Sequence, residues 1–159
     1  MPSSAPPNPS GPSGKTTRTG VTQPCTIVIF GASGDLTRRK LLPALYNLLL
    51  DGLLPENFAV LGLGRKDLSD DDFRAIARDG IEQFSRQTFQ SDKWDNFHKR
   101  LFYCAGDIKA SAYYGNIHDR VSSIETQLNL PGNRVFYLAI PPGSFAQACE
   151  GLHQVGLVS

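Results

Sequence analysis

The chain has 159 residues and a mass of 17.4 kDa, and about 40% of its residues are hydrophobic, which is enough for one domain with a buried core. This composition argues against a disordered or fibrous protein. The net charge of +1 gives no strong basic field, so the overall charge favours neither nucleic-acid binding nor attraction to an anionic membrane. The apolar runs are far shorter than the roughly 20 residues of a membrane-spanning helix.

Cysteine and histidine spacing argues against a disulfide framework and against a metal site. The cysteines are odd in number and form no C-x-x-C pair, and the histidines lack any recognised ligand spacing. We therefore expect a reducing compartment, the cytoplasm, and cysteines that serve as buried packing residues, with redox regulation left open. The residues are Cys25, Cys104 and Cys149, and His98, His118 and His153.

Residues 1–24 differ in composition from the rest of the chain. They hold six Pro, three Gly and four Ser and no acidic residue, so we predict a disordered tail. No apolar run follows Met1, which argues against a secretory signal. Gly14-Lys15-Thr16 resembles the end of a P-loop, but the motif requires glycine where Pro9 stands and no strand precedes it. A flexible segment is the favoured interpretation.

Four apolar runs from Cys25 onward predict β-strands. The first, 26–30, is a continuous β-branched and aromatic run, which is typical of a strand buried on both faces. A second strand begins roughly 30 residues later, the length of one β-α-β unit. The remaining predicted strands are 58–63, 101–105 and 135–140.

Helical periodicity alternates with these strands. Leucines from Leu41 to Leu49 form one apolar face, and Asp51-Gly52 can end that helix, although Pro43 requires it to start late or to bend. Ser69 and Asp72 predict the start of a second helix. Apolar residues at helical spacing extend it over 73–84, and similar patterns predict helices over 114–128 and 145–152. The expected fold is α/β: a doubly wound, Rossmann-like parallel sheet with helices on both faces, forming a dinucleotide-binding domain over residues 25–159.

The segment between the first strand and the first helix carries the predicted coenzyme site. It reads Gly31-Ala32-Ser33-Gly34-Asp35-Leu36-Thr37. Such a turn lies at the carboxyl end of a strand, where glycines let backbone N–H groups approach a pyrophosphate. Gly31 would make the tight turn and Gly34 would allow close approach. The spacing departs from G-x-G-x-x-G, so an ordinary turn is the alternative; a nucleophile elbow at Ser33 would need glycine in place of Asp35.

Charged residues after the strands indicate which dinucleotide binds. Arg65 follows the second strand, where a cation accommodates the 2′-phosphate of NADP, so we favour NADP over NAD. Asp67 could instead pair with Arg65 on the surface. Asp107 and Ile108 follow the third strand, where adenine would be flanked, although an Asp there can equally cap a loop. The cations of Arg38-Arg39-Lys40 oppose the helix dipole, which suggests a nearby anion.

Four motifs together resemble the amino-terminal coenzyme domain of glucose-6-phosphate dehydrogenases. They are G-A-S-G-D-L-T-R-R-K-L-L-P-A-L at 31–45, D-G-L-L-P at 51–55, L-G-L-G-R at 61–65 and R-V-F-Y-L-A-I-P-P at 134–142. The resemblance implies oxidation of glucose 6-phosphate at C1 to 6-phosphogluconolactone with hydride transfer to NADP, the first step of the pentose phosphate pathway. It also implies a homo-oligomer at full length.

The resemblance assigns roles by position. Gly31, Gly34 and Asp35 correspond to the pyrophosphate turn, with Ala32 and Leu36 beside them, and Ser33 and Arg65 correspond to 2′-phosphate contacts. Lys40 resembles a lysine near the sugar-phosphate pocket, and Pro141 resembles a proline that borders the nicotinamide. Phe145 stands where many relatives carry tyrosine, which puts a hydrogen bond there in doubt.

Two further segments of the family are not found before Ser159: E-K-P, and R-I-D-H-Y-L-G-K-E, which supplies the family's catalytic histidine and much of its sugar-phosphate site. We therefore expect a fragment that contains no catalytic residue and does not turn over substrate alone. Two alternatives stay open: another NADP-dependent reductase whose reactive residues lie downstream, and a stand-alone dinucleotide-sensing module. Neither a nucleic acid nor a membrane is an expected partner.

Overall fold

The computed structural model describes residues 23–158, so the tail predicted over 1–24 and the Gly14-Lys15-Thr16 segment lie almost entirely outside the described residues. Four strands form one parallel sheet in the order β3-β2-β1-β4. The strands are β1 (Cys25–Phe30), β2 (Phe58–Gly64), β3 (Leu101–Ala105) and β4 (Arg134–Leu138). The order and the flanking helices confirm the predicted doubly wound α/β fold.

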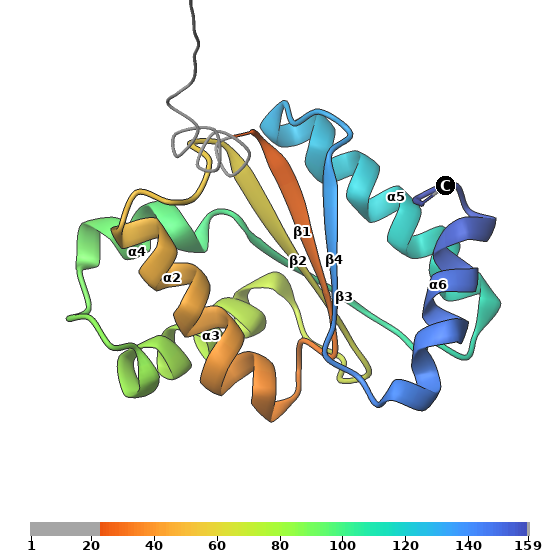
Figure 1. The fold of residues 1–159 in the computed structure, drawn as a ribbon, viewed down its shortest axis with the longest axis horizontal. Coiled ribbons are helices and arrows are strands. Elements are labelled where there is room, and N and C mark those ends of the chain that lie inside the picture. The colour runs from red at the N-terminus through yellow and green to blue at the C-terminus, as the bar shows by residue number, and fades with distance from the viewer. Residues whose placement is uncertain (1–22, 159) are drawn as a thin grey trace, which may run out of the picture.

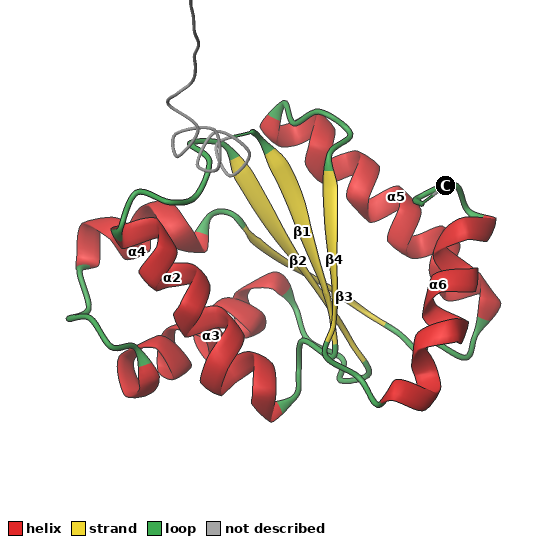
Figure 2. Ribbon diagram, viewed as in Figure 1, coloured by secondary structure: helices red, strands yellow, loops and turns green. Residues whose placement is uncertain are grey.

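Helices cover both faces of this sheet (Figures 1 and 2). On one face lie α2 (Leu42–Leu50), α3 (Asp70–Phe84) and α4 (Ser91–His98), around a core that includes Tyr46 and Phe58. On the other face lie α5 (Ser111–Leu128) and α6 (Phe145–Gln154), around a core that includes Phe30 and Ile117. The sheet therefore separates two apolar layers, as expected for strands that read as continuous apolar runs.

The first helix resolves the conflict posed by Pro43. A π-helical turn, η3 (Thr37–Leu41), comes first, and α2 begins at Leu42 with Pro43 in its first turn. The chain is helical from Asp35 onward, so Pro43 lies within a continuous helical segment, and the π-helical turn just before it is the local distortion of that segment. The regular α-helix begins at Leu42 and ends at Asp51, with Gly52 at φ +71°.

Capping explains where the next helices begin and end. The Ser69 side chain accepts a hydrogen bond from the Asp72 N–H, and the Asp72 carboxylate accepts one from the Ser69 N–H, so α3 starts with a capping box. Helix α5 ends at Asn129, which is left-handed at φ +56°. A short 3₁₀ turn, η4 (Pro142–Ser144), leads into α6. Helix α4 was not predicted, because it spans only two turns and Gln90 provides no side-chain cap.

The end of β4 differs from its prediction. The strand stops at Leu138 and not at Ile140, because Leu138 pairs with Phe30, the last residue of β1. Beyond that pair the β1 chain turns away at Gly31, so one further hydrogen bond, from the Ala139 N–H to the Phe30 oxygen at 2.9 Å, closes the ladder.

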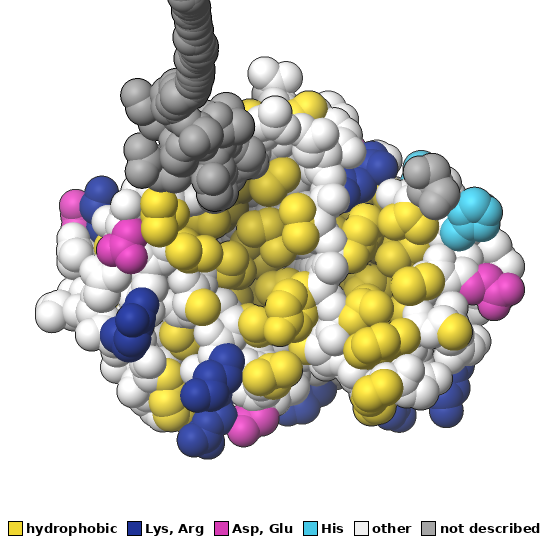
Figure 3. Space-filling model, viewed as in Figure 1, with side chains coloured by type: hydrophobic (Ala, Val, Ile, Leu, Met, Phe, Trp, Pro, Cys, Tyr) yellow, Lys and Arg dark blue, Asp and Glu magenta, His cyan; other side chains and the backbone are white. Residues whose placement is uncertain are grey.

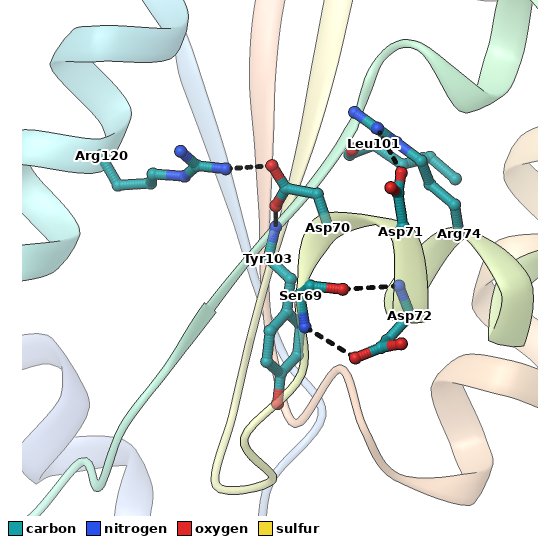
Figure 4. A network of polar contacts seen from close by, with 8 residues as sticks. All are labelled: Ser69, Asp70, Asp71, Asp72, Arg74, Leu101, Tyr103 and Arg120. Atoms are coloured by element: carbon teal, nitrogen blue, oxygen red, sulfur yellow. Dashed lines mark hydrogen bonds and ion pairs between the residues drawn. The ribbon is translucent and has the colours of Figure 1, made fainter.

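Side chains from α3 satisfy the outer edge of β3 (Figure 4). The Asp70 carboxylate accepts a hydrogen bond from the Tyr103 N–H at 2.8 Å and also pairs with Arg120 of α5. The Arg74 guanidinium donates to the Leu101 oxygen at 3.0 Å. These contacts take the place of a further strand, which prevents edge-to-edge pairing at β3.

The edge strand β4 corrects the expectation that every strand is covered on both faces. Val135 is 53% exposed and Tyr137 is 46% exposed, whereas the alternate residues Phe136 and Leu138 pack against the core beneath α5 and α6. No helix of the described residues lies over Val135 and Tyr137, and apolar side chains are visible on this face of the molecule (Figure 3).

Cys149 also departs from its prediction. Its side chain is exposed on α6, whereas Cys25 and Cys104 are partly buried. Burial raises the pKa of both partly buried thiols, which keeps them protonated and unreactive at neutral pH. Within residues 23–158 no helix is long and apolar enough to cross a membrane.

Candidate functional site

The glycine turn lies where β1 ends and is held between the neighbouring strands β2 and β4. Gly31 has φ +86°, and a Cβ at this position would overlap the backbone oxygen of Ala139. The N–H groups of Gly31 and Ala32 both donate to the Leu63 oxygen, at 2.9 and 2.8 Å. Position 31 therefore requires glycine twice, for its left-handed backbone and for its contact with the chain that leaves β4.

A buried threonine fixes the other end of the turn. Thr37 is fully buried, and its hydroxyl donates to the Gly31 oxygen at 3.0 Å, while the Gly34 N–H donates to the same oxygen at 3.0 Å. In the sequence, Thr37 stands where a further glycine of the G-x-G-x-x-G pattern might follow. Its side chain instead ties the first turn of the helix back to the end of β1.

The donors left over determine what the turn can bind. The N–H groups of Gly31, Ala32 and Gly34 donate to backbone oxygens. The N–H groups of Ser33, Asp35 and Leu36 have no backbone acceptor within the described residues. Unpaired N–H groups at a helix start form a site for an anion. The residues present thus fit a phosphate group at Ser33 to Leu36, beyond the glycines themselves.

Two glycines on β2 make room for this turn. Gly62 faces Ala32, and a Cβ at Gly64 would lie 2.6 Å from both the Ser33 Oγ and the Tyr103 hydroxyl. The absence of side chains lets Ser33 and Tyr103 meet over the end of β2. The motif L-G-L-G carried this signal in the sequence, but only the sheet register shows that Tyr103 pairs with Gly62 on the neighbouring strand.

Tyr103 also positions the loop that carries Arg65. Its hydroxyl donates to the Lys66 oxygen at 2.8 Å, and burial raises the pKa of this phenol, so the donor stays protonated at neutral pH. Arg65 itself is exposed and forms no ion pair with a carboxylate of the described residues. The alternative that Asp67 neutralises Arg65 on the surface is therefore not what the structure shows.

Protein carboxylates provide the anion expected near Arg38 and Arg39. Arg38 donates two hydrogen bonds to Asp79, at 3.2 and 2.8 Å, and Arg39 lies 3.7 Å from Asp35. Both guanidinium groups also stack on the Phe84 ring. Asp35 thus points toward arginine side chains, which leaves its N–H, rather than its carboxylate, as the group suited to a phosphate.

Lys40 lies away from the glycine turn. It lines a cavity of about 450 Å³ beside α2, together with Arg39 and Arg86 and the apolar surfaces of Pro43 and Phe84. The structure therefore separates the proposed substrate lysine from the coenzyme turn, although both belong to the first strand-helix connection.

The remaining predicted residues lie at the ends of β3 and β4. The Asp107 carboxylate accepts a hydrogen bond from the Lys109 N–H at 2.9 Å. Asp107 thus caps its own loop, which was the alternative to a contact with adenine. Ile108 is partly buried, and its oxygen accepts the Tyr114 hydroxyl at 2.8 Å. Pro141 is exposed, two residues beyond the Ala139 oxygen that touches Gly31. All three lie at the carboxyl ends of strands, on the same side of the sheet as the glycine turn.

Comparison with known proteins agrees with this geometry. The family described as "Glucose-6-phosphate dehydrogenase, NAD binding domain" matches residues 28–159. Glucose-6-phosphate 1-dehydrogenase 2 of Mycobacterium tuberculosis is 36% identical over 134 residues, which cover 84% of this chain and 26% of that protein. The enzyme of Chlamydia pneumoniae is 38% identical over 131 residues, covering 82% of this chain and 26% of that protein.

A solved structure gives the same result. A glucose-6-phosphate dehydrogenase in complex with its substrate glucose 6-phosphate superposes with a TM-score of 0.75 at 29% identity, covering 87% of this chain and 28% of that one. This chain thus spans about a quarter of the length of the relatives it matches. From residue 28 onward, it belongs to the glucose-6-phosphate dehydrogenase family, within the NAD-binding domain of that family.

Proposed function

We propose that this chain forms the NADP-binding part of a glucose-6-phosphate 1-dehydrogenase. The observation that carries the proposal is the glycine turn at the carboxyl end of β1, with its unpaired N–H groups over a β2 end cleared by Gly62 and Gly64. The relatives are named glucose-6-phosphate 1-dehydrogenase, which supports this proposal. The reaction proposed for the longer protein is the oxidation of glucose 6-phosphate at C1 to 6-phosphogluconolactone. When bound, the nicotinamide supplies the hydride acceptor.

The preference for NADP over NAD rests on Arg65. The guanidinium follows β2 directly, forms no ion pair with a carboxylate of residues 23–158, and belongs to a loop held by the Tyr103 hydroxyl. A planar cation with several donors matches the 2′-phosphate, whereas an NAD site usually presents an acid at this point. Ser33, whose hydroxyl faces the same end of β2, is the second candidate contact to that phosphate.

The substrate side is less complete in this chain. Lys40 is an exposed cation that forms no ion pair within the described residues, which suits a sugar phosphate. No residue of the chain is assigned as the general base that removes the C1 hydroxyl proton. We therefore expect the 159-residue chain to bind NADP weakly and not to reduce it with glucose 6-phosphate. Oligomeric assembly and a cytoplasmic location stay predictions.

Replacing Arg65 with alanine tests the coenzyme assignment. We expect Arg65→Ala to weaken NADP binding by about 1.5–3 kcal/mol, roughly tenfold to a hundredfold, because charge-assisted hydrogen bonds to the 2′-phosphate are lost. NAD binding should stay nearly unchanged. The measurement is a titration of the chain with each dinucleotide, followed by the backbone amide shifts of Ser33, Asp35 and Gly64.

Arg78→Ala provides the matched control, because Arg78 is half-exposed on α3, where it pairs with Glu82. This variant should bind both dinucleotides as the unaltered chain does. Equal losses for NAD and NADP in Arg65→Ala would refute the 2′-phosphate role. Dinucleotide titrations that leave the glycine-turn amides unmoved would refute the coenzyme site itself.

A further inference from the structure

A basic cavity lies between α2 and the end of α3. Its volume of about 450 Å³ is within the range of small-molecule sites. The charged residues that line it are three cations, Arg39, Lys40 and Arg86, and one acid, Asp51, which give it a formal charge of +2. Basic side chains are visible beside α2 on the face shown in Figure 3. The cavity therefore favours an anionic ligand.

Two of these cations are not neutralised by neighbouring carboxylates. Lys40 and Arg86 are exposed, and neither forms an ion pair with an acid of residues 23–158. Arg39 lies 3.7 Å from Asp35, and its guanidinium stacks on the Phe84 ring at 4.7 Å from the ring centroid. The ring contact holds this third cation at the cavity.

A buried amide supplies a further hydrogen-bond donor. Asn47 lines the cavity and is only 6% exposed. Its Oδ1 accepts from the Ser85 hydroxyl at 2.7 Å, whereas its Nδ2 has no acceptor in the part of the chain that the structure describes. A buried donor without a partner costs free energy, which a ligand oxygen would recover. The acid Asp51 is engaged with the protein itself, since it accepts from the Gln87 amide at 3.0 Å.

Apolar side chains complete the lining. They are those of Pro43, Ala44, Leu48 and Phe84. A sugar would place hydroxyl groups without partners against this surface, whereas an apolar body would remove it from water. The lining thus distinguishes the ligand of this cavity from the sugar phosphate proposed above for Lys40.

The number of donors favours a phosphate over a carboxylate. A phosphate monoester carries a charge of about −1.5 to −2 near pH 7 and has three strong acceptor oxygens. It therefore matches the formal charge of +2 and the donors of Lys40, Arg86 and Asn47 together. A carboxylate offers a single charge and two oxygens.

We propose that the cavity between α2 and α3 is a binding site for a phosphate monoester with an apolar body. The phosphate pairs with Arg86 and Lys40 and accepts the hydrogen bond of the Asn47 amide. The apolar body packs against Pro43 and Phe84. This inference rests on the lining of the cavity and is independent of the coenzyme turn and of the reaction proposed above.

Titration of the 159-residue chain with phenyl phosphate tests the site. We expect NMR shifts at the side-chain amide of Asn47 and at the backbone amide of Arg86. Phenyl phosphate should bind about tenfold more tightly than inorganic phosphate, because its ring is buried against apolar side chains. Glucose 6-phosphate, whose body is polar, should bind no more tightly than inorganic phosphate. The backbone amides of Ser33 and Asp35 report separately on any phosphate at the glycine turn.

Two variants and a matched control locate the contacts. Arg86→Ala should weaken phenyl phosphate binding about tenfold, because charge-assisted hydrogen bonds are lost. Lys93→Ala removes a cation that is exposed on α4 and does not line the cavity, and it should leave binding unchanged. Asn47→Asp keeps the size of the side chain but replaces the donor with a carboxylate oxygen, so it should weaken binding at least tenfold. Its urea midpoint checks that this variant is folded.

Absence of binding, shifts confined to Ser33 and Asp35, or equal losses in Arg86→Ala and Lys93→Ala would each overturn the proposal. So would phenyl phosphate that binds no more tightly than inorganic phosphate, because the cavity would then recognise charge alone. Glucose 6-phosphate as the tightest of the three probes would also overturn it, since the cavity would then belong to the substrate.

Discussion

The two outer strands of the sheet, β3 and β4, are both five residues long and both parallel to their neighbours, yet only β3 has a closed edge. At β3, Asp70 and Arg74 bind the outward backbone groups of Tyr103 and Leu101. At β4, the outward amides have no such partner within the described residues, and Val135 and Tyr137 are exposed. The contrast distinguishes an edge at which the sheet ends from one at which it can continue.

The closed edge also serves the candidate site. Asp70 holds the Tyr103 N–H, and the hydroxyl at the other end of Tyr103 holds the Lys66 oxygen beside Arg65. One residue of β3 thus connects the edge network to the loop predicted to select NADP. The open edge has a different link to the site, since the chain that leaves β4 packs its Ala139 oxygen against Gly31.

Truncating one apolar side chain on each edge strand should give the largest difference. Leu101 is fully buried, so we expect Leu101→Ala to lower the free energy of unfolding by about 3 kcal/mol through lost burial and the remaining cavity. Val135 is 53% exposed, and Val135→Ala should cost less than about 0.5 kcal/mol. Urea unfolding measures both. Similar costs for the two variants would show that β4 is already covered in the free chain.

Removing the carboxylate that closes the β3 edge should have the next largest effect. Asp70→Ala leaves the Tyr103 N–H and the Arg120 guanidinium without their acceptor, and we expect a loss of about 2 kcal/mol, reduced from that of a buried pair because both side chains are about 30% exposed. Asp71→Ala is the control, since Asp71 pairs with Arg74 but is 92% exposed, and its loss should stay below about 0.5 kcal/mol.

Replacing Asp70 with asparagine tests separately its role as hydrogen-bond acceptor for the Tyr103 N–H and its negative charge. The Asp70→Asn variant keeps an oxygen that can accept from the Tyr103 N–H but loses the negative charge, so it should recover part of the stability. Hydrogen exchange at Tyr103 gives a second readout for the three variants. The interpretation of the β3 edge would be wrong if Asp70→Ala left this exchange rate and the urea midpoint unchanged.

The sequence predicts those parts of the fold that depend on local patterns. Continuous apolar runs predicted the positions of all four strands, and the Ser69 and Asp72 pair predicted the start of α3. Pro43 predicted an irregularity in the first helix, which the structure shows as a π-helical turn before α2. The glycine turn was predicted because its residues and its flanking elements are contiguous. The exposure of the Val135 side chain was not predicted, because an apolar run has the same pattern in an edge strand as in a central strand of a sheet.

Contacts between residues that are distant in the sequence could not be predicted from local patterns. Tyr103 contacts the end of β2 only through strand pairing, and Asp70 reaches β3 only because α3 packs across it. Lys40 is four residues from Leu36 in sequence, yet it lines a cavity beside α2 with Arg86. Cys149 was expected in the core, but it lies on the exposed face of α6.

Alkaline pH should give the smallest effect and tests the link between the β3 edge and the Arg65 loop. Burial raises the pKa of Tyr103 above its ordinary value of 10.0, so the folded state retains this proton when the unfolded state has lost it. The resulting stability is complete below pH 10 and is lost as the pH rises through the folded pKa. Near pH 8, Tyr103→Phe should cost about 1 kcal/mol, since the hydrogen bond to the Lys66 oxygen is lost. Urea unfolding at about pH 8 and about pH 11 should show this difference between the two proteins narrowing, whereas a constant or widening difference would exclude a protonated Tyr103 as the anchor of the loop.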